Sequence, residues 1–287
     1  MTTDARSTTG LVLGGGGVTG IAWEIGLLKG LRDLGTDLTS ADTVIGTSAG
    51  SVVGAQVTSK IDLDDLYAEQ TSPADAEVGA DFGAMTMLKL VALMALPANP
   101  IQRRRRIGLA ARKAHPEPAT ERLRVIGDRL RTPQGDTLDW PDHDLRITAV
   151  DADNGRLKVF DRTTGVDLLH AVAASCAVPL VWPAVEIDGR HYVDGGMRSP
   201  ANADLVKECE VVLVIAPLPR SVSRYHGLSR QLTRTGATRT AVISPDADAL
   251  KAIGKNVLDP AKRVGAAKAG CAQAQQVAAE VAKGWAG

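Results

Sequence analysis

The sequence predicts an α/β protein, and two repeats of one pattern carry that prediction. Leu11–Leu13 is an apolar run that ends in glycines and continues into helical spacing over 21–34. The β-branched run Thr43–Ile45 likewise ends at a glycine and becomes helical after Ser48. Strand, turn and helix in succession are typical of α/β folds. With 287 residues, 44% of them hydrophobic, the chain can form one large domain, which we place at residues 8–287.

Composition excludes several classes of function. The formal net charge is zero and the pI is about 7.0, so nothing attracts the whole molecule to nucleic acid or to an acidic membrane. Aromatic residues make up only 3%, which leaves few platforms for stacking bases. The three cysteines lie far apart without a Cys-x-x-Cys pair, so we predict neither a metal site nor a disulfide framework. Residues 1–10 lack an apolar signal core, which favours a cytoplasmic protein.

Ser48 is the candidate nucleophile. It stands in Gly46-Thr47-Ser48-Ala49-Gly50, at the junction between the second strand and its helix. A serine at such a sharp turn is held in a strained conformation, and glycines two residues before and after remove side chains that would clash. The alternative is an ordinary glycine-rich turn, because a single match to a short pattern is weak evidence.

The first strand runs into Gly14-Gly15-Gly16-Gly17, followed by Gly20. This loop matches a dinucleotide fingerprint, but the second strand ends at Ser48 and not at an acidic residue that could bind a ribose. A row of bare main-chain amides near a nucleophile instead favours an oxyanion hole. Tight helix packing would explain one or two of these glycines.

Asp194 is the candidate general base. Val185–Ile187 and Arg190–Val193 are predicted to form a hairpin that ends in Asp194-Gly195-Gly196. A carboxylate fixed there by a glycine turn can face a nucleophile, although Asp-Gly is also a common turn sequence.

In the order glycine loop, Gly46-x-Ser48-x-Gly50 and Asp194-Gly195-Gly196, the chain resembles the patatin-like phospholipase family. The resemblance continues through Ala174–Pro179 up to Pro200. It implies a three-layer α/β/α core with a mainly parallel sheet, and a Ser48–Asp194 dyad that hydrolyses acyl esters of lipids without a cofactor. It also implies an oxyanion hole, which we assign to Gly15, Gly16, Gly17 and Ala49. The family loop usually carries arginine or lysine where this chain has Thr19, so electrostatic support of the oxyanion must come from elsewhere or be weak.

A Ser-Asp-His triad is the alternative arrangement. It would need an acid such as Asp151 served by His170, His191 or His226. We expect His170 inside a helix and His191 within a strand, neither in a recognisable catalytic loop. The dyad is therefore preferred.

Residues 61–144 are predicted to be a helical cap insertion. The segment Phe82–Leu96 is almost entirely apolar, and Arg103–Arg106 follows it closely. A buried core helix and a solvated basic loop would explain each feature separately. Together they predict a lipid-contacting cap over Ser48 that touches anionic membranes peripherally.

The remaining core elements are a hairpin over 145–160, a helix over 166–176, strands over 211–215 and 240–244, and a terminal helix over 261–285. The leading hypothesis is a serine lipid acyl hydrolase with a lipid or acyl-ester substrate. Its alternative is a catalytically weak or inactive membrane-associated lipid-binding protein of the same fold, and a nucleotide-dependent oxidoreductase ranks third. The sequence does not indicate an oligomeric state or which lipid is cleaved.

Overall fold

The computed structural model describes residues 8–72, 84–218 and 227–285, and within them eight strands form one sheet. The strand order is β5-β6-β3-β2-β1-β7-β8, with β4 paired to β3. The five strands from β3 through β2, β1 and β7 to β8 are parallel neighbours, whereas β4, β5 and β6 pair antiparallel. This is the mainly parallel sheet that we expected. The strands are β1 (Thr9–Leu13), β2 (Thr43–Thr47), β3 (Asp144–Asp151), β4 (Leu157–Phe160), β5 (Val185–Ile187), β6 (Arg190–Asp194), β7 (Val211–Ile215) and β8 (Arg239–Ile243).

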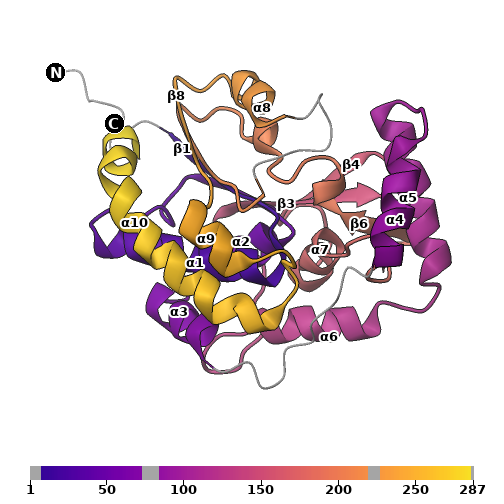
Figure 1. The fold of residues 1–287 in the computed structure, drawn as a ribbon, viewed down its shortest axis with the longest axis horizontal. Coiled ribbons are helices and arrows are strands. Elements are labelled where there is room, and N and C mark those ends of the chain that lie inside the picture. Colours follow the sequence, from indigo (N-terminus) through magenta and orange to yellow (C-terminus); the bar gives the residue numbers. More distant parts are fainter. Residues whose placement is uncertain (1–7, 73–83, 219–226, 286–287) are drawn as a thin grey trace.

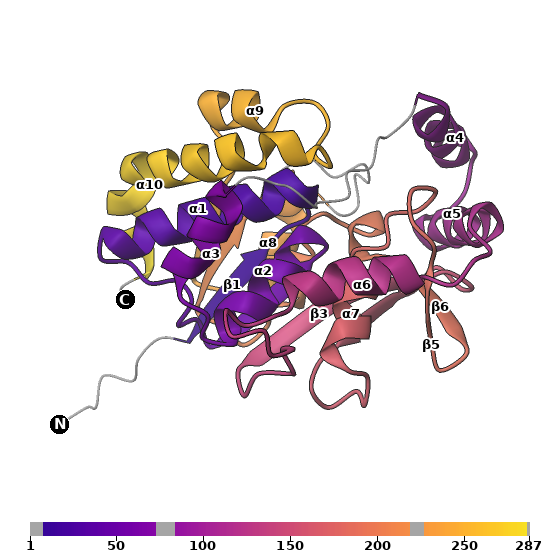
Figure 2. The same cartoon turned by 90° about the horizontal axis from the view of Figure 1, so that it is seen from below.

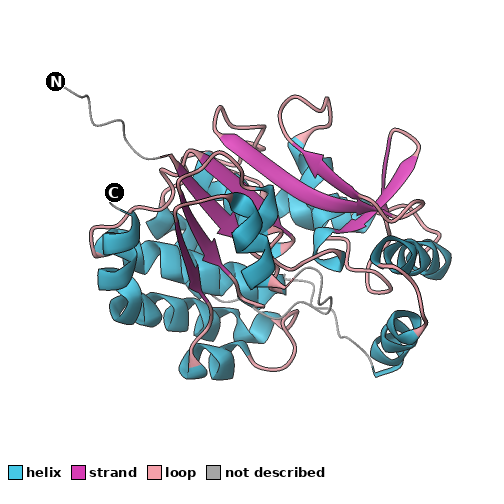
Figure 3. Cartoon of the chain, turned by 90° about the horizontal axis from the view of Figure 1, so that it is seen from above, coloured by secondary structure: helices cyan, strands magenta, loops and turns pink. Residues whose placement is uncertain are grey.

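Helices cover both faces of the sheet, which gives the three-layer α/β/α arrangement (Figure 1, Figure 3). Leu11 and Leu13 of β1 belong to a core shared with α1 (Gly17–Asp33), α2 (Ala49–Thr58), α7 (Leu168–Ser175) and α10 (Arg263–Trp285). Val12, between them, faces the opposite core with residues 201–209 and α8 (Leu228–Thr235). Alternate residues of a strand point to opposite faces, so β1 is apolar throughout because both faces are covered.

Residues 61–144 hold α3 (Leu63–Thr71), α4 (Ala84–Ala95), α5 (Pro100–Ala114) and α6 (Thr120–Arg129). These helices do not form one packed unit: α3 packs on α1 and α10, α6 packs on α7, and α5 packs on β3 and β6. In Figure 2, α4 lies beside α5 at the end of the molecule away from α10. Phe82, the first residue of the predicted apolar helix, lies outside the described residues. No helix in the described part is long and apolar enough to cross a membrane.

Two of the alternative interpretations of residues 82–106 and one expected helix boundary were wrong. First, Arg103–Arg106 do not form a solvated loop but lie in α5, which begins at Pro100 after a capping box between Asn99 and Gln102. Second, α4 is not a buried core helix, because the Leu88 side chain is 61% exposed. Third, α1 begins at Gly17, four residues before the expected start at Ile21. A further helix, α9 (Ala247–Ile253), was not predicted. The two expected hairpins, β3 with β4 and β5 with β6, are present.

Candidate active site

Ser48 sits in a strained turn between β2 and α2, with φ 52° and ψ −116°. Its amide donates to Ser175 Oγ at 2.9 Å. Its carbonyl oxygen accepts from Ser51 Oγ at 2.6 Å and from Cys176 Sγ at 3.3 Å. A non-glycine residue with this backbone costs free energy and persists only when its surroundings fix it. Side chains of α2 and of the segment at the end of α7 therefore hold the turn.

The two flanking glycines are required by close approach of main-chain atoms. A Cβ at Gly46 would lie 2.6 Å from Ser51 Cα, and one at Gly50 would overlap the carbonyl group of Leu13. The strand and helix can cross at this distance only because both positions lack a side chain. This confirms the steric reason for which the sequence pattern was singled out.

Asp194 ends β6, and the structure brings it to Ser48. Its Oδ1 accepts from the Gly196 amide at 2.7 Å, and the carboxylate lies close enough to Ser48 for the serine side chain to lower its pKa. Only 6% of Asp194 is exposed. Burial raises the pKa of Asp194 to about 6, while the Ser48 side chain, the hydrogen bond from Gly196 and the positive charge of Arg122 act in the opposite direction. The result is a carboxylate that can exchange a proton near neutral pH.

Some amides of the glycine loop already donate hydrogen bonds within the protein, and others do not. The Gly15 amide donates to the Pro200 carbonyl at 2.8 Å, which argues against Gly15 as an oxyanion donor. Within the described residues, no hydrogen bond uses the amides of Gly16, Gly17 or Ala49. Of these three, Gly17 and Ala49 line the pocket at Ser48. Gly20 lies in the first turn of α1, where its amide donates to Gly16.

Two buried side chains of α1 make hydrogen bonds that hold the glycine loop and its neighbours in place. Glu24 of α1 is fully buried and accepts from the Gly14 amide at 2.9 Å, and burial raises its pKa well above the ordinary value. Thr19 is also buried, and its hydroxyl donates to the Val257 carbonyl at 3.3 Å. Thr19 therefore packs the loop and brings no charge to the site.

The pocket at Ser48 is small, about 20 Å³, which is room for one water-sized group. Its walls come from α1, α2, α6, the segment from Cys176 to Trp182, and Leu258. No residue of α4 or α5 lines it, so in the described part of the chain the insertion reaches Ser48 through α6 and not through the predicted cap over 82–106.

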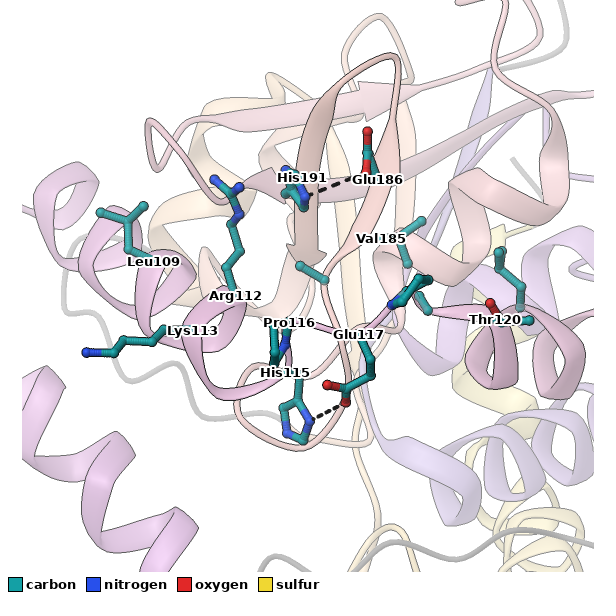
Figure 4. A pocket seen from close by; sticks show the side chains of 14 residues that line it. Leu109, Arg112, Lys113, His115, Pro116, Glu117, Thr120, Val185, Glu186 and His191 are labelled. Carbon is teal, nitrogen blue, oxygen red and sulfur yellow. Dashed lines mark hydrogen bonds and ion pairs between the residues drawn. The ribbon is translucent and has the colours of Figure 1, made fainter.

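The described histidines lie elsewhere. His191 lines a separate cavity of about 540 Å³ between α5, α6 and the β5–β6 hairpin, with its Nε2 3.8 Å from a Glu186 carboxylate oxygen (Figure 4). His170, in the first turn of α7, pairs with the helix-capping Asp167. His226 lies outside the described residues. Asp151 pairs with Arg190 at 3.2 Å. The described lining of the Ser48 pocket includes none of Asp151, His170 and His191.

Asn202 is a buried residue that the sequence analysis missed. It has left-handed backbone angles, and its Nδ2 lies within hydrogen-bond distance of Thr47 Oγ1 at 3.1 Å and of the Gly195 carbonyl at 3.3 Å. It thereby connects the residue before Ser48 to the residue after Asp194. Asparagine tolerates left-handed turns, which is a weak sequence signal, but nothing local indicates its distant partners.

Comparison with known proteins agrees with the resemblance read from the motifs. The model of the family described as patatin-like phospholipase matches residues 11–207. Among solved structures, VipD from Legionella pneumophila is 13% identical with a TM-score of 0.48, and the match covers 96% of this chain and 67% of that one. ExoU in its complex with SpcU, from the type III secretion system of Pseudomonas aeruginosa, is 19% identical with a TM-score of 0.38. That match covers 94% of this chain and 52% of ExoU, so the chain spans about half of ExoU. No curated protein sequence matched.

Proposed function

We propose, because the chain belongs to the patatin-like phospholipase family, that it is a serine-dependent lipid acyl hydrolase with a Ser48–Asp194 dyad. The observation that carries the proposal is the buried Asp194 carboxylate beside the strained Ser48 turn, close enough for the Ser48 side chain to lower its pKa. A serine hydroxyl becomes a nucleophile when an adjacent base can take its proton. Asp194 has both the position and the raised pKa for this role.

The residues suggest the following sequence of steps. Asp194 takes the Ser48 proton as Oγ attacks the ester carbonyl carbon, and the carbonyl oxygen becomes an oxyanion. The amides of Gly16, Gly17 and Ala49 are the available donors for that charge. Asp194 then protonates the departing alcohol and leaves an acyl-Ser48. Water, deprotonated by Asp194, releases the fatty acid and restores Ser48.

The alternative, a weak or inactive lipid-binding protein, is favoured by the size of the pocket. A space of about 20 Å³ does not hold an acyl chain, so substrate entry requires the walls to separate. A protein that cannot separate them would keep the fold and lose turnover.

We also propose peripheral contact with a lipid surface through α4 and α5. Exposed apolar side chains gather on these two helices and their connection, among them Leu88 (61% exposed) and Leu96 (51%). Exposed cations, Lys89, Arg105 and Lys113, lie on the same helices. An interfacial helix combines these two features, and it would bring the enzyme to an insoluble substrate.

A fluorophosphonate probe tests the hydrolase proposal, because it labels only a working serine nucleophile. Wild type should be labelled and should hydrolyse p-nitrophenyl octanoate, while Ser48→Ala loses both and keeps the far-ultraviolet circular dichroism spectrum. Ser229→Ala, which changes an exposed serine on α8, is the matched control and should behave as wild type. Labelling that persists in Ser48→Ala would refute Ser48 as the nucleophile, and an unlabelled wild type would favour the lipid-binding alternative.

A further inference from the structure

α6 carries a buried arginine to the wall of the Ser48 pocket. Arg122 is only 9% exposed, and its guanidinium lies over the Trp182 ring with 4.8 Å between Cζ and the ring centroid. One terminal nitrogen donates to the Cys176 carbonyl at 3.0 Å. Asp194 interacts electrostatically with Arg122, but no carboxylate of the described chain is close enough to form an ion pair with it. Burying a cation in this way is costly unless an anion compensates it.

Two hydrogen-bond donors in this wall have no acceptor. Arg122 Nε and Trp182 Nε1 are both buried and both lack a partner among the described residues. A buried donor without an acceptor destabilises the fold, so each such group calls for a specific explanation. The two residues stack on each other and line the same pocket as Ser48, which makes one shared acceptor the simplest explanation.

The charge of the pocket indicates what kind of acceptor this is. Arg129, about two helical turns further along α6, lines the pocket as well. The described lining contains these two arginines and no acidic side chain. The rest of the wall is apolar, with Val18, Ile21 and Leu258. A molecule with an anionic oxygen close to an acyl ester would match both the charge and the apolar surface.

We propose that Arg122 and Trp182 form an anion subsite beside Ser48, which selects acyl esters with a negatively charged group close to the scissile bond. This inference rests on the proposed hydrolase function. Arg122 binds the anionic oxygen through charge and hydrogen bonds, and Trp182 holds the guanidinium in place and adds a donor. The subsite determines specificity, whereas Ser48 and Asp194 carry out the bond cleavage.

The test compares two octanoyl esters that share the acyl chain. One is p-nitrophenyl octanoate, which is neutral, and the other is the octanoyl ester of a nitrophenol with a ring carboxylate. The measured quantity is the ratio of their kcat/KM values, anionic over neutral. Arg122→Gln should lower this ratio about 10- to 100-fold, as expected for loss of a charge-assisted hydrogen bond. Arg122→Lys should restore part of it, because it keeps the charge.

Two further variants separate binding from folding. Trp182→Phe keeps a ring beneath the guanidinium but removes the Nε1 donor, and should lower the ratio by less than Arg122→Gln. Arg124→Gln is the matched control: it neutralises an exposed arginine on the same helix that pairs with Glu121 and Asp128, and should leave the ratio unchanged. Inorganic phosphate should inhibit wild type competitively and Arg122→Gln more weakly.

The outcomes distinguish a failure of the anion subsite from a failure of the proposed hydrolase function. A wild type that hydrolyses neither ester and resists the fluorophosphonate probe contradicts the hydrolase itself. A wild type that hydrolyses both esters, with a ratio that Arg122→Gln and Arg122→Lys leave unchanged, overturns the anion subsite alone. An equal fall for both esters in Arg122→Gln would also overturn it, because a purely structural arginine affects every substrate alike.

Discussion

Two regions meet at Ser48, and they differ in how their side chains acquire a role. The strand-end turns at Ser48 and Asp194 have a sequence signature within a few residues, Gly46 and Gly50 on one side and Gly196 on the other, although distant groups also hold the Ser48 turn. The insertion helices depend on partners far along the chain. Arg122 of α6, for instance, stacks on Trp182 and contacts Cys176. Roles fixed by local geometry can be predicted from sequence, whereas roles fixed by tertiary contacts need the fold.

The run Arg103–Arg106 shows why the insertion was predicted poorly. Four consecutive cations suggested a solvated loop, but each arginine donates to main-chain carbonyl groups. Arg104 donates to Gly155 at 2.8 Å, and Arg105 to Asp153 at 2.9 Å. Arg103 and Arg106 donate to carbonyl groups between residues 93 and 98, at the end of α4 and just after it. These acceptors lie on several sides of the helix, although Arg103 Nε has no partner among the described residues, and no pattern within residues 103–106 reveals them.

The sheet was easier to predict because its strands are buried runs between clear turns. The position of Asp194 beside Ser48 followed from the order of the motifs and from the family resemblance. Asn202 could not be inferred, since its partners Thr47 and Gly195 lie on different strand ends that only the fold brings together.

The largest expected effect is on the rate of hydrolysis, after a substitution at one of the strand-end turns. Asp194→Asn keeps the shape of the side chain but cannot take the Ser48 proton, so kcat/KM should fall by about 10² to 10⁴, the usual contribution of a general base. Measured ester hydrolysis and fluorophosphonate labelling check this. His170→Ala and His191→Ala, as controls, should keep wild-type rates. Near-normal turnover in Asp194→Asn, or loss of turnover in a folded histidine variant, would restore the triad hypothesis.

The same carboxylate predicts the pH dependence. Asp194 acts as a base only when deprotonated, and its pKa is raised to about 6 by burial. Hydrolysis should therefore be lost below pH 6, by about tenfold per pH unit, and reach a plateau above it. The raised pKa also means that the contribution of Asp194 to fold stability falls as pH rises from about 4 to about 6, because the folded state favours the protonated carboxyl group. A kcat/KM profile that stays flat from pH 7 down to pH 4.5 would contradict Asp194 as the base.

A smaller effect, on the free energy of unfolding, is expected when one glycine from each region is replaced by alanine. Gly50→Ala places a methyl group against the Leu13 carbonyl, which is main chain and cannot move aside, so it should destabilise the fold by about 1–3 kcal/mol. Gly127→Ala on α6 meets only ordinary contacts with Leu169, the closest at 3.8 Å, and should be neutral or stabilising by up to about 1 kcal/mol. Urea unfolding midpoints measure both changes. The reverse order would mean that the turn at Ser48 is less constrained than its close contacts indicate.

The smallest effect concerns membrane contact, and the structure changes which arginine should be tested. Replacing Arg103–Arg106 together would remove the carbonyl contacts that hold α5 to α4 and to residues 153–155, so weaker binding could simply reflect unfolding. Arg105 is the exposed member of the run, while Arg104 is 8% exposed. A cation near an anionic surface contributes about 1 kcal/mol. Arg105→Gln should therefore weaken binding to anionic vesicles about fivefold at low salt, and less as salt screens the charge.

Co-sedimentation with neutral and anionic vesicles across a salt series measures this effect. Arg230→Gln changes an exposed arginine of α8, which packs on residues 203–205, and as the matched control it should bind as wild type. Arg104→Gln should lower the urea midpoint but leave the salt dependence of binding unchanged, because its guanidinium is buried against the Gly155 carbonyl. Equal binding of Arg105→Gln and Arg230→Gln, or no binding by wild type at any salt, would remove membrane contact from the role of the insertion. It would leave α6, through Arg122, as the only part of the described insertion with a role at the active site.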